Sequence, residues 1–451
     1  MVTRTKKYLI IVYEIRDFQK LHLMLLSLVC DLKGRKVQRI LDINYMKIIR
    51  YSLQFMGGWP SRLLGENVSK FEHIHILHLS VLSVICLPSM LLYLKRNIGV
   101  IDFLDLGFSY ITCSLNLFAT FRLFVVFRKI YGDLMVDFIH KIHMFHQKER
   151  SEYAMSTNLK VHRLSQFYAI YVNVMLVFGI LFYNVTPIYK NIKSGAYSNY
   201  KTENVTFEHS VNYIFPFDCT RNIKGYAVVF VYNWYISYIV SSSVLTFDLL
   251  MSLLIFHVYG HIQILINNLK KFRRPSFELK VGSIESKMYS KEEMKLVTND
   301  LRNIVIHHKL IKDFIDTMTE SFGYILFLYY VFLLAVGSAL LLECSPMNGE
   351  ALGRYGIMTL AIFQQLIQLS VIFELLGISS DKLCDEVYGL PWEYMDTSNR
   401  KIVNIILLNS QKSLSIKALG IVQVGVQSMV TVLKTSFSYF IMLKSFTGSE
   451  N

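Results

Sequence analysis

The feature that most constrains this chain is a series of long stretches without charged side chains. A helix needs roughly 20 mostly apolar residues to cross the hydrocarbon core of a bilayer. Stretches of about that length recur along the 451 residues, and two of them hold an internal charge, Arg122 and Lys434. The predicted transmembrane spans are residues 73–94, 104–127, 164–189, 225–247, 321–342, 355–373 and 418–443.

Composition agrees with a membrane protein and excludes the other classes. Only 18% of the residues are charged and 53% are hydrophobic, whereas a soluble domain carries about 25% charge. The 14% aromatic content excludes a disordered chain, and six cysteines are too few for a disulfide scaffold. We therefore predict an all-α, polytopic membrane protein with seven transmembrane helices.

The positions of Lys and Arg predict how the chain is oriented. Basic residues concentrate in cytoplasmic loops, and 36 of the 47 fall in segments that are cytoplasmic if the N-terminus is inside. Because seven is odd, the C-terminus is then extracellular. Residues 43–72 form a cytoplasmic segment that leads into the first span, and residues 1–42 form an atypical N-terminal extension.

The cytoplasmic segments predict further helices. The fourth span continues to residue 269 with little charge, and apolar periodicity returns at Val297–Phe314 and Ile402–Gln411. These helices would form an intracellular anchor domain. The polar residues 270–296 would be a cytoplasmic linker between spans 1–4 and the second part of the chain, residues 297–451.

Two sets of histidines have spacings that can bind metal, but neither predicts a metal site. His140, His143 and His146 recur at every third position, and His257 and His261 are one helical turn apart. Neither set has a Glu at the general-base position of a metalloprotease motif, so solvated or interhelical histidines are the favoured interpretation. We expect no cofactor, no metal and no enzymatic activity. The net charge of +14 predicts contact with anionic lipid rather than nucleic acid.

Covalent modifications are predicted only for the extracellular loops. Cys219 and Cys344 would both face outward, which makes them a candidate disulfide. Asn204, in Asn204-Val205-Thr206, would be a glycosylation acceptor.

The last span carries a polar stripe. Gln427, Thr431, Lys434 and Ser438 recur at spacings of four, three and four, which places them on one helix face. The stripe continues into Ile441 and Met442, so a water-filled conduit along it would be closed near its mouth by apolar side chains. The alternative is a buried hydrogen-bonded seam between helices.

Lys434 complicates the conduit because an ammonium group in the lumen opposes cation passage. It could pair with Asp248, pair with Asp105, or extend to the membrane rim.

Aromatic side chains in the outer halves of spans two, three, four and six predict an apolar ligand cavity. The candidate ligand-binding residues are Tyr110, Cys113, Phe118, Phe178, Phe182, Tyr232 and Phe363. Thr112, Asn116 and Asn233 could add hydrogen bonds. The alternative is that these aromatic rings face lipid or pack between helices.

The C-terminal region resembles the insect odorant receptors. The likeness rests on Leu390-Pro391-Trp392-Glu393, Asn399-Arg400-Lys401 and Leu433-Lys434-Thr435-Ser436-Phe437-Ser438-Tyr439-Phe440. Other segments are similar to the moth sex-pheromone receptor subgroup: Tyr45-Met46-Lys47-Ile48-Ile49-Arg50, Gly57-Gly58-Trp59-Pro60, Lys224-Gly225-Tyr226 and Tyr232-Asn233-Trp234-Tyr235. The resemblance covers about residue 43 to the end.

This resemblance implies a subunit of a ligand-gated, non-selective cation channel, assembled as a heterotetramer with the shared odorant-receptor co-receptor. A volatile hydrophobic ligand, a long-chain acetate, aldehyde or alcohol, would bind among spans two, three, four and six. Span seven would line the pore at Gln427, Thr431 and Ser438, with the gate at Ile441 and Met442. The protein would lie in the plasma membrane of olfactory neuron dendrites.

Three other functions remain alternatives. A G-protein-coupled chemosensory receptor would place its N-terminus outside, against the charge distribution, and no Asp-Arg-Tyr follows the third span. A transporter would favour paired, broken half-helices, which the sequence lacks. A gustatory-type receptor channel is the third.

Overall fold

The computed structural model describes residues 39–66, 70–101, 103–198, 205–281, 284–345 and 352–448. The chain divides into two units, Met1–Lys47 and Ile48–Asn451. In the first unit, a short helix η1 (Ile40–Asp42) precedes the start of α2 (Asn44–Phe55). The second unit contains all the predicted spans.

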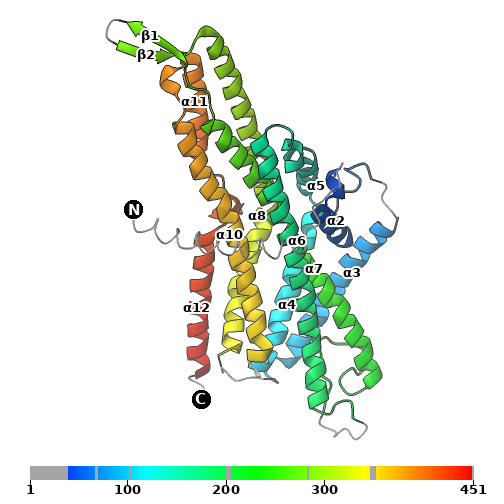
Figure 1. Ribbon diagram of the computed structural model, residues 1–451. Coiled ribbons are helices and arrows are strands. Elements are labelled where there is room, and N and C mark those ends of the chain that lie inside the picture. The colour runs from blue at the N-terminus through cyan, green and yellow to red at the C-terminus, as the bar shows by residue number, and fades with distance from the viewer. Residues whose placement is uncertain are drawn as a thin grey trace. The chain divides into compact units, whose positions relative to one another are not determined.

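Seven long helices carry the seven predicted spans (Figure 1). They are α3 (Lys70–Asn97), α4 (Phe103–Leu123), α6 (Glu152–Lys193), α7 (Ile223–Lys270), α8 (Lys291–Glu343), α10 (Ile357–Tyr388) and α12 (Val426–Gly448). Among the described residues, five segments are long and apolar enough to cross a membrane: Leu106–Phe127, Glu152–Lys193, Ile223–Lys270, Lys291–Glu343 and Ile357–Tyr394. The first and last predicted spans lie on α3 and α12, which are outside these five.

Short elements connect the long helices. They are η2 (Phe124–Phe127), α5 (Lys129–Asp137), η3 (Phe138–Ile142), η4 (Met144–Gln147), η5 (Leu352–Gly356), η6 (Trp392–Tyr394) and α11 (Thr397–Ser410). Asp396 caps α11 by accepting from the Asn399 N–H at 3.0 Å. The helix covers most of the periodic segment that the sequence predicted.

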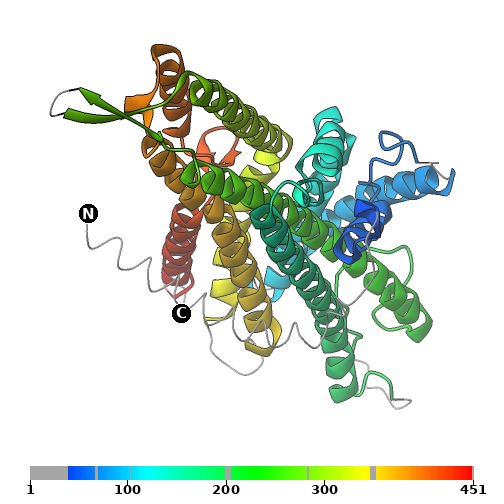
Figure 2. The ribbon, with the colours of Figure 1, turned by 45° about the horizontal axis from the view of Figure 1, so that its top comes forward.

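Two antiparallel hairpins were not predicted. β1 (Phe277–Val281) pairs with β2 (Ile284–Met288) inside the polar linker, in the register Phe277 to Met288, and projects beyond the helices (Figure 2). β3 (Lys417–Ala418) pairs with β4 (Val422–Gln423) just before α12. Between β3 and β4, Leu419 and Gly420 have φ of 51° and 72°, a left-handed conformation that ends any helix. The last span therefore begins as a helix at Val426, and the predicted start at residue 418 is wrong.

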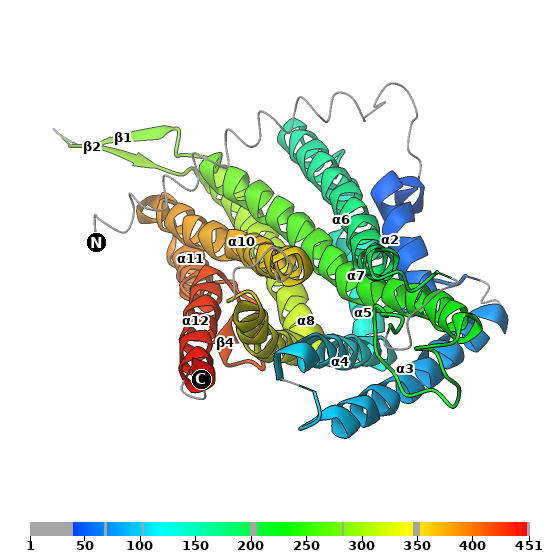
Figure 3. The same ribbon diagram turned by 90° about the horizontal axis from the view of Figure 1, so that it is seen from below.

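The long helices pack around α7 and α8. Helix α7 contacts α6 and α10, whereas α8 contacts α4 and α12. Figure 3 shows α12 at one side of the bundle, beside α10 and far from α6. Most of α7 is buried, which explains why its sequence is apolar on all faces rather than on one stripe.

Of the two histidine sets, His143, His257 and His261 are buried between helices, whereas His140 and His146 are exposed. His261 Nδ1 is 2.9 Å from His307 Nε2, which joins α7 to α8. Its other ring nitrogen donates to the Ile142 carbonyl at 2.7 Å, and the Met144 N–H donates to His257 Nδ1 at 3.0 Å. Burial lowers the pKa of His261 to about 4. Among the described residues, no group of three or more His, Cys, Asp or Glu side chains could hold a metal ion.

Candidate functional site

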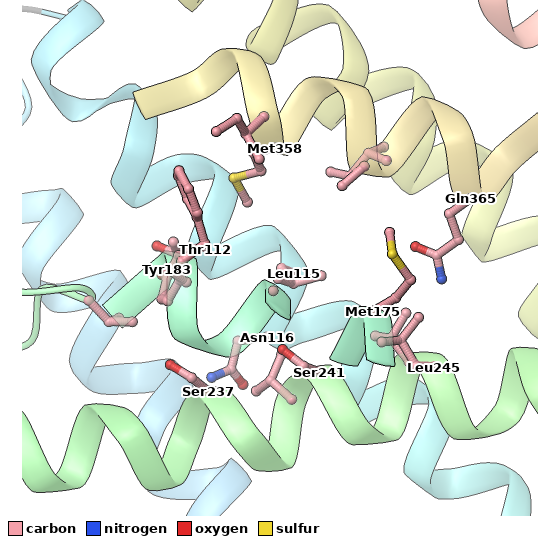
Figure 4. A pocket seen from close by; sticks show the side chains of 18 of the residues that line it. Thr112, Leu115, Asn116, Met175, Tyr183, Ser237, Ser241, Leu245, Met358 and Gln365 are labelled. Atoms are coloured by element: carbon pink, nitrogen blue, oxygen red, sulfur yellow. The ribbon is translucent and has the colours of Figure 1, made fainter. Parts of the chain in front are cut away.

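A cavity of roughly 280 Å³ lies between α4, α6, α7 and α10 (Figure 4). These are the second, third, fourth and sixth spans. Its volume is near the lower end for small-molecule sites, roughly 300–1,000 Å³. The apolar lining side chains include Met90, Phe108, Leu115, Val172, Met175, Phe182, Val211, Ile236, Val240, Val244, Leu245, Ile357, Met358, Ala361, Ile362 and Leu369. Such a lining favours a hydrophobic ligand.

One end of the cavity is covered by the loop between α6 and α7, and we call it the loop end. Lys190, Glu208 and His209 line it. The Asn191 side chain donates to the Glu208 carbonyl at 2.9 Å and accepts from its N–H at 2.8 Å. Further along the loop, Ser89 Oγ donates to the Ile214 carbonyl at 3.0 Å. Because backbone groups of the loop are bonded to helix side chains, the loop has a defined position over the cavity.

The opposite end is lined by Tyr168, Tyr171, Gln364 and Gln368, and we call it the glutamine end. Gln364 Nε2 donates to the Tyr171 hydroxyl and, at 2.6 Å, to Gln368 Oε1. Gln368 Nε2 in turn donates to the Tyr168 hydroxyl. These bonds tie α6 to α10. They also satisfy amide groups that would be costly to leave unpaired inside a membrane.

A buried ion pair lies beside the glutamine end. Arg122 Nη1 is 2.7 Å from Asp248 Oδ1, and the two side chains are 0% and 4% exposed. Asp248 also accepts from Gln365 Nε2, and both residues line the cavity. The guanidinium group lies over the rings of Phe118 and Tyr329, 4.7 Å and 5.2 Å from their centroids. The pairing explains how the second span tolerates an arginine.

Of the seven candidate ligand-binding residues, only Phe182 lines the cavity. Two of the three proposed polar groups, Thr112 and Asn116, line it as well. Figure 4 shows Thr112 beside Tyr183 and Asn116 beside Ser237, with Gln365 on the other side of the space. The cavity therefore lies among the four spans that the sequence predicted to hold the ligand, but few of the predicted side chains line it.

The other six candidates lie elsewhere. Tyr110, Cys113 and Tyr232 pack in an adjoining apolar cluster with Cys86 and Ile236, and of these five residues only Ile236 also lines the cavity. Phe118 stacks on Tyr329 and Phe332, with ring centroids 5.5 Å and 4.8 Å away. Phe178 is 66% exposed, and Phe363 lies against Gly337 of α8. Aromatic content selects the right helices but not the face of each helix that meets the cavity.

Tyr168, Tyr171 and the three glutamines of α10 were missed. A signal for them existed, because Gln364, Gln365 and Gln368 lie in an uncharged span and fall within about one helical turn. Polar residues so placed normally face a bundle interior or a cavity. The partners on α6 carry no comparable signal, since tyrosine is common on helix surfaces of every kind.

The polar stripe of α12 is exposed. Gln427, Thr431, Lys434 and Ser438 are all exposed, as are Ile441 and Met442, at 65% and 45%. Val432 and Ser436 are buried on the opposite face. Thr431 and Ser438 donate to carbonyl groups of α12 itself, each at 3.0 Å. The stripe therefore does not form a hydrogen-bonded seam with another helix of the described chain.

Lys434 does not pair with Asp248, because Arg122 occupies that carboxylate. The side chain of Asp105 lies outside the described residues, so that alternative stays a prediction.

The candidate disulfide does not form. Cys219 and Cys344 are both free. The Cys219 carbonyl accepts from His209 in the α6–α7 loop, whereas Cys344 lies at the end of α8 with its sulfur 3.5 Å from Thr359 Oγ1. Each cysteine thus has its own local environment. Asn204, the glycosylation acceptor, lies outside the described residues.

Comparison with known proteins identifies the family. Residues 102–437 match the family model described as 7tm Odorant receptor. Odorant receptor 10a of Drosophila melanogaster is 24% identical over 161 residues, which are 34% of this chain and 38% of that protein. The alignment thus spans well under half of that relative's length.

Solved structures show the same fold. The insect olfactory receptor OR5 from Machilis hrabei superposes with a TM-score of 0.69 at 15% identity, covering 89% of this chain and 97% of that one. The same receptor in complex with eugenol gives a TM-score of 0.70 at 15% identity, covering 89% and 98%. Since the family model spans most of the sequence, this chain belongs to the insect odorant receptor family.

Proposed function

We propose that this protein is an odorant receptor subunit of a ligand-gated, non-selective cation channel. A volatile hydrophobic ligand would bind in the cavity between α4, α6, α7 and α10, and α12 would line the pore. The observation that carries the proposal is this pairing of features: a mostly apolar cavity inside the bundle and an exposed polar stripe on a separate helix.

The cavity supports ligand binding because its lining is mostly apolar and has polar groups at each end. That arrangement suits a long-chain acetate, aldehyde or alcohol, the ligand class of the moth sex-pheromone receptors that parts of the sequence resemble. Structural similarity to a receptor solved with eugenol supports a small volatile ligand.

The stripe supports a pore because it has no partner helix in the described part of this chain. In lipid, an exposed ammonium and amide would be costly. If α12 helices from several subunits surround a common axis, Gln427, Thr431 and Ser438 face water instead, and Ile441 and Met442 form an apolar constriction. The partner subunit we propose is the shared odorant-receptor co-receptor, in a heterotetramer with the N-termini in the cytoplasm. The site of action would be the plasma membrane of olfactory neuron dendrites.

The test is whole-cell current in cells that express this chain with the co-receptor, each alone, and neither. A panel of long-chain acetates, aldehydes and alcohols should evoke inward cation current when both are present, and this chain alone should evoke none. Absence of any evoked current, with both proteins at the cell surface, would overturn the channel proposal.

A matched pair of variants on α6 tests the location of the ligand. Phe182 lines the cavity, whereas Phe178, one turn away, does not. Phe182→Ala should weaken ligand potency about tenfold or more, because it removes apolar contact area. Phe178→Ala should leave potency within about twofold. Equal shifts in both variants would contradict binding in this cavity.

A further inference from the structure

At the glutamine end of the cavity, a hydrogen-bond network connects α6, α7 and α10. The donor and the acceptor of each bond in it can be assigned from the chemistry of the groups. Ser252 Oγ lies 2.7 Å from the Asp248 carbonyl oxygen and 3.1 Å from the Tyr168 hydroxyl oxygen. A carbonyl oxygen can only accept, so the single Ser252 proton goes to Asp248, and Tyr168 donates to Ser252. The Tyr168 oxygen is then the acceptor for the amide of Gln368.

The same direction continues to Tyr171. Gln368 uses its amide nitrogen on Tyr168, so its oxygen accepts from Gln364 at 2.6 Å. The second proton of the Gln364 amide goes to the Tyr171 oxygen. A tyrosine hydroxyl has one proton of its own to donate, and the network does not use it. Tyr171 therefore has an unused donor, and Gln364 Oε1 beside it is an unused acceptor.

No free charge accompanies these groups. The carboxylate of Asp248 is paired with Arg122 at 2.7 Å and accepts from Gln365. An ammonium or carboxylate ligand would enter this end without a counter-ion, which is expensive in a buried site. The chemistry therefore favours an uncharged oxygen-bearing group, such as a carbonyl or a hydroxyl.

The loop end differs. Lys190 Nζ is 3.5 Å from Glu208 Oε2, and the Glu208 side chain is 49% exposed. His209 bonds to the Cys219 carbonyl at 3.0 Å. His209 Nδ1 is buried without a hydrogen-bond partner, and because Nε2 donates to the Cys219 carbonyl, Nδ1 can only accept. A ligand carbonyl oxygen therefore finds no donor on His209, and the Lys190 ammonium is paired with Glu208. Tyr171 and Phe182 are separated by about 16 Å along α6, and the rest of the lining is mostly apolar but includes Asn116, Ser237 and Ser241.

We propose that the Tyr171 hydroxyl anchors the oxygen-bearing end of an uncharged, elongated ligand, with Gln364 Oε1 beside it and the hydrocarbon chain extending toward the loop end. This assignment rests on the proposed function and adds which way the ligand lies. It makes Tyr171 a specificity-determining residue that separates oxygenated ligands from hydrocarbons of the same length.

The direction is tested by photolabelling the unaltered, purified full chain. Two probes are derived from dodecanol, one with a diazirine next to the hydroxyl group and one with a diazirine at the far end of the chain. The first should label the segments around Tyr171 and Gln364, and the second should label those around Phe182 and Met358. Excess dodecanol should abolish both, whereas dodecylamine and dodecanoic acid should compete at least tenfold less well.

The role of the hydroxyl group is tested with Tyr171→Phe and a control. The variant should weaken competition by dodecanol about fivefold to tenfold, the value of one lost hydrogen bond, and should leave competition by dodecane unchanged. Tyr189→Phe is the matched control, because Tyr189 lies on the same helix, is 65% exposed and is outside the cavity lining. It should change neither value by more than about twofold.

Reversed labelling, absence of competable labelling, or equal effects of the two variants would each overturn the anchor. Labelling does not depend on current. If the labelling pattern is as expected and no ligand opens a channel, the anchor stands and the channel proposal fails. If current is evoked but labelling is reversed, the channel stands and the anchor fails.

Discussion

Polar side chains occur both beside the cavity and on the last helix, α12, within segments predicted to cross the membrane. The two groups differ in whether the chain itself supplies their hydrogen-bond partners. Beside the cavity, the Arg122 and Asp248 side chains are buried and paired, and Asp248 also accepts from the partly exposed Gln365. On α12, Gln427 and Lys434 are exposed, and the hydroxyl groups of the stripe bond only within their own helix. A polar group within a membrane needs either a partner in the chain or water. The polar side chains beside the cavity have partners in the chain, whereas those on α12 need water.

Removing one member of the buried ion pair should have the largest effect. Asp248→Ala leaves the Arg122 guanidinium buried without its counter-ion, and such losses cost about 3–5 kcal/mol. We expect little folded protein at the cell surface and a large drop in the thermal unfolding temperature of what is recovered in detergent.

The double variant Arg122→Met with Asp248→Leu is the control. It removes both charges and should regain most of the lost stability, since apolar replacements of a whole buried pair are often neutral. If the single variant is as stable as the unaltered protein, the pair does not support the cavity wall.

Cysteine labelling should distinguish the two faces of α12. Ser438 is exposed on the stripe, and Ser436 is fully buried on the other side. In cells with the co-receptor, a charged methanethiosulfonate reagent should modify Ser438→Cys at least tenfold faster than Ser436→Cys, because only the first would face water. A stripe that faces lipid would make both positions unreactive, in resting and stimulated cells alike.

The constriction gives the next prediction. Ile441→Ala and Met442→Ala shorten the apolar side chains that would exclude water from the closed pore. Resting current should rise several-fold relative to the ligand-evoked maximum, or ion selectivity should change. Phe437→Ala is the control, because Phe437 is exposed but off the stripe. Unchanged currents at both positions would argue against a gate there.

The smallest expected effect concerns the buried histidines outside the membrane. Like the polar side chains beside the cavity, His143 is buried and has a hydrogen-bond partner in the chain. Burial lowers the pKa of His143 to about 3, below the ordinary value of about 6.5. The unfolded chain then binds this proton and the folded chain does not, so stability should fall as pH falls from about 6.5 toward 3.

The expected loss is about 1 kcal/mol for each such histidine between pH 6.5 and 5.5. Thermal unfolding in detergent at the two pH values measures it. His143→Asn keeps an acceptor for the Phe145 N–H, which now donates to Nδ1 at 3.2 Å, and it should reduce the slope. An unchanged slope would mean that His143 titrates alike in both states.

Sequence reasoning located the helices better than the site. Runs without charge determine which segments can cross a bilayer, so each predicted span lies on a long helix. The start of the last span was wrong because the turn at Leu419–Gly420 depends on local backbone geometry, which hydropathy does not register. Arg122 and Asp248 are 126 positions apart, and only folding shows that they are partners. Which side chains line the cavity depends on how each helix is rotated about its own axis, and the aromatic pattern did not determine that rotation.

The two central helices have a mechanical consequence. Helices α7 and α8 run for 48 and 53 residues, about 72 Å and 80 Å, and neither contains a proline at which it would hinge. Helix α7, which lines the cavity at Ser241 and Asp248, behaves as a stiff rod from there to the imidazole of His261, which contacts His307 of α8. A ligand that tilts one rod by a few degrees would therefore displace its distant end by several ångströms, so a small molecule could produce a large movement far from where it binds.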